Sequence, residues 1–420
     1  MIDSASALYR WIVENNIRIA ANNPFAWAPG HMMHDTDNLL RMIHLRELDP
    51  NRMYIYPLQE SHIPAVMADM YRKHFAPHSN VHFMVSNAAV AWCREISQLA
   101  PQMTVDIGLS HSKFAWTDPS RARLYPFAGG LHWIVENEVV YKSHLDWLKR
   151  RRASPGYQPL RDVPAIQDEE FIRFLGGDTS KLALVHLKHV MANATIPARP
   201  EDFDQAFAIL KDTGHTIVAV GREECPEYFR KVHGVIDYGK SQFASFRNDL
   251  LLFKAASIAL VNASGLTVVG QLLDTPMVSM NSWMLRTGLL TSDRGVFLPA
   301  MVRHKASGRL LKFIEHVALI DRRPQPWNME PDQYSQAGSC GNPLTFRSGE
   351  LEDYEPLAAS PDEVAEAVKE VLLLKERDEP LTPLQVSFQN LTANFHAKWQ
   401  EGRISRYFAE KHAGAIEPGY

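Results

Sequence analysis

The sequence is poor in cysteine, with only Cys93, Cys225 and Cys340 among its 420 residues. Three scattered thiols are too few for a disulfide framework or a regularly spaced zinc site. Such sparse cysteine is typical of proteins in a reducing compartment. We therefore expect a cytoplasmic protein that needs no structural metal.

The sequence also lacks an excess of one charge and any long apolar run. Its 44 Lys and Arg residues and 48 Asp and Glu residues leave a net charge of −4, which excludes a strongly basic nucleic-acid binder. No apolar run reaches the length of a membrane span, and the N-terminal stretch does not have the pattern of a signal peptide. Hydrophobic residues make up 45% and charged residues 22%, the balance of an ordinary globular protein.

Short apolar segments alternate with segments of helical spacing along most of the chain. This alternation predicts parallel sheets covered by helices, an α/β fold with two Rossmann-like domains. In the first half it predicts strands over 25–28, 53–58, 81–85 and 103–109, with helices over 37–48, 63–74 and 88–99. In the second half it predicts strands over 181–187, 215–221, 235–238, 258–261 and 275–280, with helices over 200–213, 226–232, 248–256 and 266–273.

A basic run followed by Pro- and Gly-containing sequence marks the boundary between the two halves. The sequence predicts an N-terminal domain over 1–155, a linker over 156–180 and a second domain over 181–380. Residues 381–420 are expected to form a closing helical segment. The polar, Pro-rich stretch 321–360 is long for a loop and is expected to be a lid or a peripheral excursion.

A polar segment, Gly30 to Asp37, follows the first predicted strand. Ligands of open α/β sheets lie beyond the carboxyl ends of strands, so a base in this loop would face a ligand. His31, His34, Asp35 and Asp37 each could deprotonate a hydroxyl. Two other interpretations stay open: an aspartate that only caps the next helix, or a metal site, for which the spacing gives no strong signature.

Small and hydroxyl-bearing residues follow the predicted strand 258–261. Ser264 and Gly265 would let a phosphate approach the backbone where the next helix offers free N–H groups and the positive end of its dipole. Thr267 adds a second hydroxyl. A Ser-Gly turn before a helix is common, so this pattern is weak on spacing alone.

Basic side chains follow two other predicted strands of the second half. Lys188 comes after the strand that ends with His186, and Arg222 comes after the strand that ends at Gly221. A cation at such a strand end can stabilise a developing diphosphate charge. The alternative is a lysine whose ammonium group simply reaches solvent.

The order of these short motifs resembles a family of bacterial glycosyltransferases with the two-domain GT-B architecture, and the donor domain resembles that of the heptosyltransferases. The matching segments lie in 182–315: Val185–Lys188, Val235–Tyr238, Asn248-Asp249, Ala263–Leu266, Thr275–Val278 with Asn281, and Gly308–Leu310 before Glu315. The first half matches mainly in architecture.

This resemblance implies transfer of a sugar from a nucleotide-sugar donor to an acceptor hydroxyl across a cleft between the domains. A nucleotide-sugar co-substrate, no other cofactor and no metal are implied. The acceptor would be a glycan, a lipid-linked glycan or a protein. The implied donor-binding residues are Lys188, His186, Arg222, Ser264, Gly265, Leu266, Thr267 and Asn281.

The acceptor would bind the first domain, where we expect Gly30 and His31 to contact it. The catalytic base is expected to be Asp35, then His34, then Asp37 in order of preference, on the physical argument given above. Two other functions stay open. One is a non-reducing sugar-nucleotide epimerase on the same fold, and the other is a catalytically inactive binding protein of GT-B form.

Overall fold

A computed structural model describes residues 3–21, 29–72, 80–107, 123–127, 130–134, 163–187, 196, 199–262, 264–282, 294–316, 353–376, 379–393 and 403–416. The chain divides into two compact units. The described residues before Pro164 belong to the first unit, and those from Pro164 onward belong to the second.

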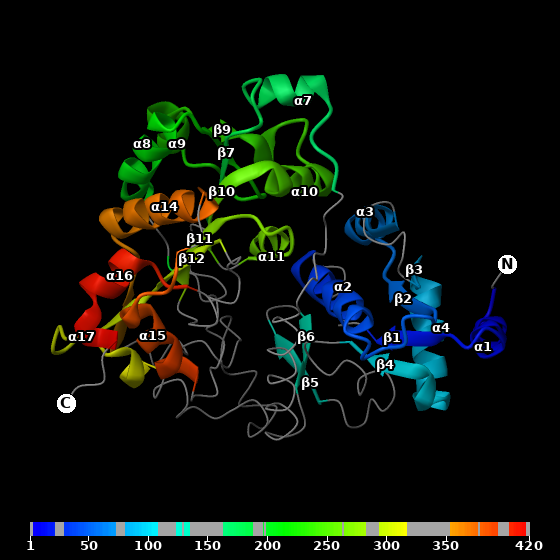
Figure 1. The fold of residues 1–420 in the computed structure, drawn as a ribbon. Helices are drawn as coiled ribbons and strands as arrows, with labels where there is room; N and C mark the ends of the chain where they lie inside the picture. Colours follow the sequence, from blue (N-terminus) through cyan, green and yellow to red (C-terminus); the bar gives the residue numbers. More distant parts are fainter. Residues whose placement is uncertain are drawn as a thin grey trace. The chain divides into compact units, whose positions relative to one another are not determined.

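The first unit contains a four-stranded parallel sheet in the order β3-β2-β1-β4 (Figure 1). Its strands are β1 (Arg18–Ala21), β2 (Tyr54–Leu58), β3 (Val81–Val85) and β4 (Thr104–Asp106). Its helices are α1 (Ala5–Glu14), α2 (Pro29–His44), α3 (His62–Met70) and α4 (Asn87–Leu99), followed by the short η2 (Pro101–Met103). An antiparallel hairpin, β5 (Arg123–Phe127) with β6 (Gly130–Ile134), comes later in the unit.

Alternate residues of these strands make different contacts because side chains alternate between the two faces of a sheet. Ile19 and Ile55 form one core with α1 and α4, to which Leu8 and Cys93 contribute. Tyr56, one residue further along β2, forms an edge-to-face pair with Phe83, at 5.7 Å between ring centroids. The predicted strands 53–58 and 81–85 and helix 88–99 are confirmed to within one residue at each boundary. Helix 63–74 and strand 103–109 are confirmed over α3 and β4, and residues 73–74 and 108–109 lie outside the described residues.

The start of the first unit differs from the prediction. Segment 30–37 was expected to be a loop but is helical, because α2 begins at Pro29. Proline at the first helical position loses no hydrogen bond, so Pro29 starts this helix instead of keeping the chain out of it. Gly30, His31, His34, Asp35 and Asp37 therefore lie in the first turns of α2. The predicted strand 25–28 lies outside the described residues, and the strand observed before α2 is β1.

The second unit contains a six-stranded parallel sheet in the order β12-β11-β10-β7-β8-β9. Its strands are β7 (Leu182–His186), β8 (Thr216–Ala219), β9 (Ile236–Asp237), β10 (Ala256–Val261), β11 (Met277–Ser282) and β12 (Val296–Pro299). The helices between them are α8 (Asp204–Asp212), α9 (Glu227–His233), α10 (Phe246–Ala255) and α11 (Gly265–Leu272), with the 3-10 turns η3 (Pro200–Phe203) and η4 (Tyr238–Lys240). The helix α7 (Glu169–Phe174) precedes the sheet, within the predicted linker.

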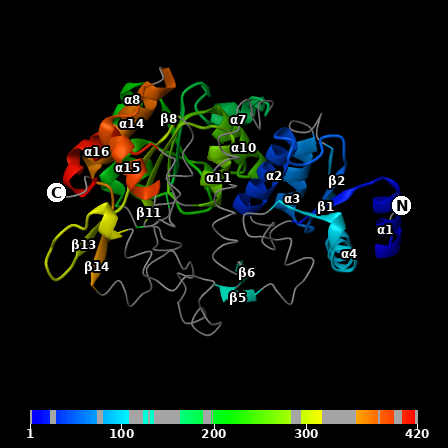
Figure 2. The ribbon, with the colours of Figure 1, turned by 60° about the horizontal axis from the view of Figure 1, so that its bottom comes forward.

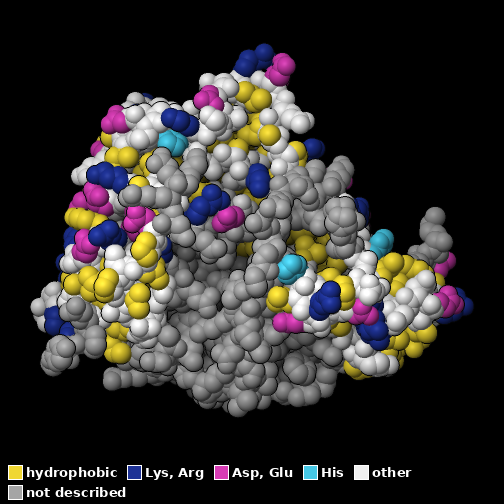
Figure 3. Space-filling view, viewed as in Figure 1, with side chains coloured by type: hydrophobic (Ala, Val, Ile, Leu, Met, Phe, Trp, Pro, Cys, Tyr) yellow, Lys and Arg dark blue, Asp and Glu magenta, His cyan; other side chains and the backbone are white. Residues whose placement is uncertain are grey.

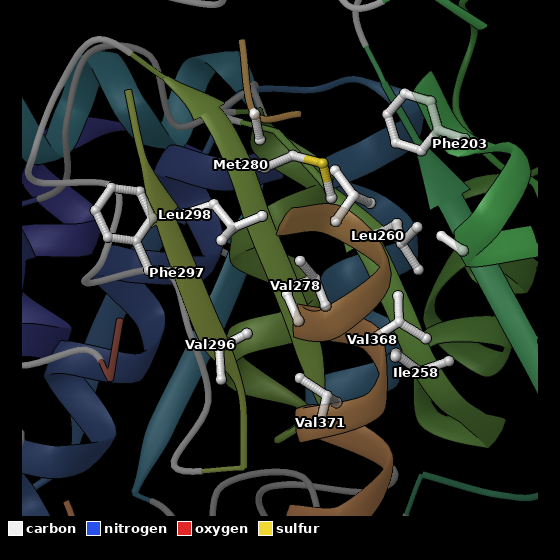
Figure 4. Close-up of a cluster of buried hydrophobic side chains, with 14 of the residues drawn as sticks. Phe203, Ile258, Leu260, Val278, Met280, Val296, Phe297, Leu298, Val368 and Val371 are labelled. Atoms are coloured by element: carbon white, nitrogen blue, oxygen red, sulfur yellow. The ribbon is translucent and has the colours of Figure 1, made fainter. Parts of the chain in front are cut away.

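The two faces of this sheet are covered by different helices. On one face, α8 and α14 (Pro361–Glu376) pack on β8, β10, β11 and β12. Figure 4 shows Val368 and Val371 of α14 lying against Ile258, Leu260 and Val278. On the other face, α10 contacts β7 and β10 and packs against α11. Both faces are buried, so the strands are nearly continuous runs of apolar residues, as the sequence shows.

The end of the chain completes the second unit. Helices α15 (Pro383–Ala393), α16 (Arg406–Lys411) and α17 (Ala413–Ile416) contribute Phe388, Phe408 and Ile416 to the core of this unit. Ile404 forms a parallel bridge with Phe297 of β12, so the chain end covers the edge of the sheet. The strands β13 (Met301–His304) and β14 (Tyr354–Leu357) form an antiparallel pair of their own (Figure 2).

No helix in the described part of the chain is long and apolar enough to cross a membrane. On the face seen in Figure 3, acidic and basic side chains are interspersed over the helices of the second unit. Among the described residues of this face, charges of one sign do not gather into an extended patch.

Candidate functional site

The strand order of the second unit identifies one edge where a ligand is expected. The chain runs from β7 outward to β8 and β9, then returns to the other side of β7 to form β10, β11 and β12. In open α/β sheets, ligands bind beyond the carboxyl ends of the two strands where the order reverses. Here these strands are β7 and β10, paired with His186 opposite Val261. We call the carboxyl ends of these two strands the β7–β10 edge.

The turn after β10 brings the start of α11 to the β7–β10 edge. Ser264 is the N-cap of α11, and its Oγ accepts a hydrogen bond from the N–H of Thr267 at 3.2 Å. Helix geometry leaves the N–H groups of the first residues, Gly265 and Leu266, without an acceptor inside the helix. Gly265 is exposed and Leu266 is half-buried. An anion could therefore reach these N–H groups, as the sequence predicts.

Two other predicted donor residues serve the structure of the unit. The hydroxyl of Thr267 is buried and donates to the carbonyl of Asn262, so it shapes the turn from inside. Asn281 is buried at the end of β11 with φ +55°, and its Oδ1 accepts from the N–H of Ala359 at 3.0 Å. Lys188 lies outside the described residues.

His186 is buried at the β7–β10 edge with 3% of its surface exposed. Its Nδ1 lies 3.0 Å from the carbonyl oxygen of Val220. A carbonyl can only accept, so Nδ1 carries a proton. The Glu223 carboxylate lies 3.7 Å from the same Nδ1. The carbonyl of His186 accepts from the N–H of Asn262 at 3.2 Å, so the backbone of the two strand ends is joined two residues before the N-cap of α11.

Arg222 lies in the loop after β8 and interacts electrostatically with Asp249, which the sequence analysis did not select as a site residue. The exposed guanidinium of Arg222 lowers the pKa of the Asp249 carboxyl, but burial in α10 outweighs it and raises this pKa to about 7. The hydroxyl of Tyr238 also interacts with Asp249, and it donates to the carbonyl of Ser245 at 3.0 Å. In the sequence, Asp249 belongs to the matching segment Asn248-Asp249, but the sequence analysis assigned it no role in the site.

In the first unit, the predicted catalytic residues lie on α2. Asp35 is fully buried, and Asp37 is 6% exposed. Burial raises the pKa of Tyr56 well above its ordinary value, and the nearby Asp35 carboxyl raises it further. Burial likewise raises the pKa of Tyr71 well above its ordinary value, and the nearby Asp37 carboxyl raises it further. Both tyrosines therefore stay protonated and can act only as neutral hydroxyl groups beside the two carboxylates.

The strand order of the first unit also reverses once, between β1 and β4. The helix α2 follows β1, so its first turns belong to the carboxyl edge where a ligand is expected. Gly30 is buried. The roles predicted for it and for His31 and His34 stay predictions. Within the described ranges, no cluster of three His, Cys, Asp or Glu residues could hold a metal ion.

No protein-family model and no curated protein matches this sequence. Among solved structures, it is similar to the glycosyl transferase family 9 protein from Veillonella parvula, with 11% identity over 85% of this chain and 97% of that chain, at a TM-score of 0.43. It is also similar to the iron-containing dodecameric glycosyltransferase TibC from enterotoxigenic E. coli, with 14% identity over 63% of this chain and 57% of that chain, at a TM-score of 0.35. A third similar structure is the E. coli heptosyltransferase WaaC with ADP, with 12% identity over 63% of this chain and 86% of that chain, at a TM-score of 0.33.

Those solved structures are glycosyltransferases of the kind that the sequence resembles. The fold class of this protein rests on its own two parallel sheets, each with one reversal of strand order. The α/β prediction with two Rossmann-like units is therefore confirmed.

Proposed function

We propose that this protein is a glycosyltransferase that moves a sugar from a nucleotide-sugar donor to an acceptor hydroxyl, without a metal ion in the chemistry. The observation that carries the proposal is the β7–β10 edge. There the start of α11, capped by Ser264 and with Gly265 exposed, follows β10, and the neighbouring strand β7 ends at His186, whose imidazole is oriented by the carbonyl of Val220. A helix start of this kind binds a phosphate through its backbone N–H groups and its dipole.

In this proposal the nucleoside diphosphate is the leaving group. The bond between the anomeric carbon and the diphosphate oxygen breaks, so negative charge grows on the diphosphate. The N–H groups of Gly265 and Leu266 stabilise that charge, and Lys188 and Arg222 supply cations next to it. Ser264 keeps the turn in shape, because its capping bond fixes the direction of the first N–H groups.

The acceptor hydroxyl must lose a proton as the new bond forms. We assign this proton transfer to α2, with Asp35 as the first candidate for the base, then His34 and Asp37. Gly30 and His31 would contact the acceptor, whether it is a glycan, a lipid-linked glycan or a protein. The sparse cysteine content favours the cytoplasm as the site of the reaction.

Two variants of α2 test the base assignment. Asp35→Asn keeps the shape of the side chain and removes its basicity, so transfer should fall by roughly 10²–10⁴-fold while donor affinity changes little. Asp37→Asn is the matched comparison, and it should affect transfer less. Full turnover in Asp35→Asn would overturn the assignment of Asp35.

The reaction itself is tested by measuring nucleoside diphosphate release from a panel of nucleotide sugars, in a chelator, with and without candidate acceptors. Acceptor-dependent release supports glycosyl transfer. Conversion of the nucleotide sugar into an isomer without any acceptor would instead identify an epimerase. Binding of nucleotides without either reaction would identify a binding protein.

A further inference from the structure

A close backbone contact joins η4 to the loop after β8. We call this loop, Gly221 to Glu224, the β8 loop. A Cβ atom built on Gly239 would lie 2.2 Å from the carbonyl oxygen of Gly221. Carbon and oxygen atoms do not approach so closely, and the obstacle is backbone that cannot rotate away. Position 239 therefore needs glycine for lack of space.

The β8 loop is in turn packed against His186. Gly221 has φ +100°, a conformation that favours glycine. A Cβ atom on Gly221 would lie 2.5 Å from Nδ1 of His186 and 2.8 Å from Oε2 of Glu223. The same Nδ1 is bonded to the carbonyl of Val220, the residue just before the loop. The position of the β8 loop therefore fixes the orientation of the imidazole.

These contacts form a continuous path from η4 to the start of α11. Gly239 touches Gly221, Gly221 touches His186, and the carbonyl of His186 accepts the N–H of Asn262. The carbonyl of Asn262 accepts a hydrogen bond from the Thr267 hydroxyl within the turn that Ser264 caps. Gly239 itself belongs to η4, which follows β9 in the chain. In the sheet, β8 lies between β9 and β7.

Two further contacts hold η4 in place. The Tyr238 hydroxyl donates to the carbonyl of Ser245 and accepts from its N–H, both at 3.0 Å, which ties η4 to the start of α10. The Lys240 ammonium lies 2.8 Å from the Glu224 carboxylate of the β8 loop. That ion pair is exposed and contributes little by itself, whereas the close contact of Gly239 with Gly221 leaves no space between η4 and the β8 loop.

We propose that Gly239 is a positioning residue for the nucleotide-sugar donor, acting through the β8 loop on His186. This inference rests on the proposed function for the identity of the ligand. The structural part of it, the mechanical coupling of Gly239 to His186, does not depend on any ligand.

The direct test is Gly239→Ala. The new Cβ atom and the Gly221 carbonyl must separate by roughly 1 Å, which moves the β8 loop away from η4. Displacements of this size weaken oriented contacts strongly, so we expect the Kd for a nucleoside diphosphate and the KM for its sugar to rise roughly tenfold or more. The kcat should change little, because no reacting group is removed. An unchanged Kd and KM would overturn the proposal.

Gly414→Ala is the matched control. Gly414 is an exposed helical glycine with nothing within 4 Å of its added Cβ atom, and it does not have a positive φ. We expect this variant to bind and turn over like the unmodified protein.

A double-mutant cycle with His186→Gln tests the path. If Gly239 acts through His186, then Gly239→Ala should raise the Kd by less than roughly twofold in the His186→Gln background. Equal effects in both backgrounds would show that Gly239 does not act through His186.

The imidazole signal of His186 gives a readout that needs no ligand. In a spectrum of ¹⁵N-labelled histidine, the His186 signals are those lost in His186→Gln. We expect them to shift in Gly239→Ala, as the Nδ1 bond to Val220 weakens, and to stay in place in Gly414→Ala. Unshifted signals in Gly239→Ala would overturn the coupling. If no nucleotide binds the unmodified protein, the proposed function fails, while this spectrum still decides the coupling.

Hydrogen exchange on the unmodified protein covers the case in which Gly239→Ala does not fold. Coupling between two sites is reciprocal. A nucleoside diphosphate should therefore slow exchange in the β8 loop and η4 as well as at the start of α11, and leave α17 unchanged. Slowing at α11 alone would contradict the proposal.

Discussion

Asp249 makes the stability of this protein depend on pH in a direction opposite to that of most carboxylates. Its carboxyl is buried in α10, and this burial raises its pKa from 3.8 to about 7. In the unfolded chain the pKa returns to its ordinary value. At pH values between these two pKa values, the native state binds a proton that the unfolded state does not. The stability that this proton contributes is therefore lost as the pH rises.

The magnitude follows from the two pKa values. Linkage gives a fall of about 2–3 kcal/mol in the free energy of unfolding between pH 5 and pH 8 from this one group. Asp249→Asn replaces the carboxyl with an amide that never ionises. The advantage of the variant over the unmodified protein in the free energy of unfolding should therefore grow by about 2–3 kcal/mol between pH 5 and pH 8.

Urea unfolding followed by tryptophan fluorescence at several pH values measures this difference. Asp212→Asn, at an exposed position at the end of α8, serves as the control for removal of one carboxylate. A difference between Asp249→Asn and the unmodified protein that stays constant from pH 5 to pH 8 would refute the reasoning. It would mean that Arg222 and Tyr238 stabilise the Asp249 carboxylate enough to cancel its burial.

Three further predictions concern the second unit, each read from the free energy of unfolding. Leu260→Ala leaves a cavity between β10 and α14 and should destabilise by about 2–5 kcal/mol; a loss below about 1 kcal/mol would mean that the core collapses around it. Ser264→Ala removes the cap of α11 and should destabilise by about 1 kcal/mol, while Ser264→Gly should lose only a few tenths. Gly270→Val places a Cβ atom 2.7 Å from Met277 and 2.9 Å from Phe253, so overpacking should destabilise by about 1–3 kcal/mol; a neutral result would show that these side chains move aside.

The strands of the second unit were predictable because both sheet faces are buried. The runs Leu182–His186 and Ala256–Val261 are wholly buried, so their apolar composition was a direct signal. The strand order was not predictable in the same way. It depends on which strands pair, as His186 does with Val261, and pairing leaves no periodicity in the sequence.

The start of α2 shows a different limit. Proline and glycine are both common in turns, so the pair Pro29-Gly30 favours a break in the chain when the sequence is taken alone. The same proline is favourable at a first helical position, and only the packing of the following residues decides between the two. Met32 and Met33 are fully buried, so the tertiary core selects the helix.

The candidate site was predictable where a motif is local and missed where it is assembled from distant segments. The Ser264 cap and its helix lie within a few residues, and the sequence identified them. Gly239 and Gly221 are 18 positions apart in the sequence. In the structure they lie so close that a Cβ atom built on Gly239 would be 2.2 Å from the carbonyl oxygen of Gly221. A glycine in the sequence does not indicate which backbone it touches.

The most direct test of the central claim is a thermal-shift screen against nucleoside diphosphates and nucleotide sugars, with and without Mg²⁺. A ligand that binds only the folded state raises the melting temperature by mass action. The account predicts a clear shift with one nucleoside diphosphate in a chelator, and loss of that shift in Gly265→Val, where a side chain blocks the approach to the first turn of α11. No shift with any nucleotide, or an equal shift in Gly265→Val, would contradict it.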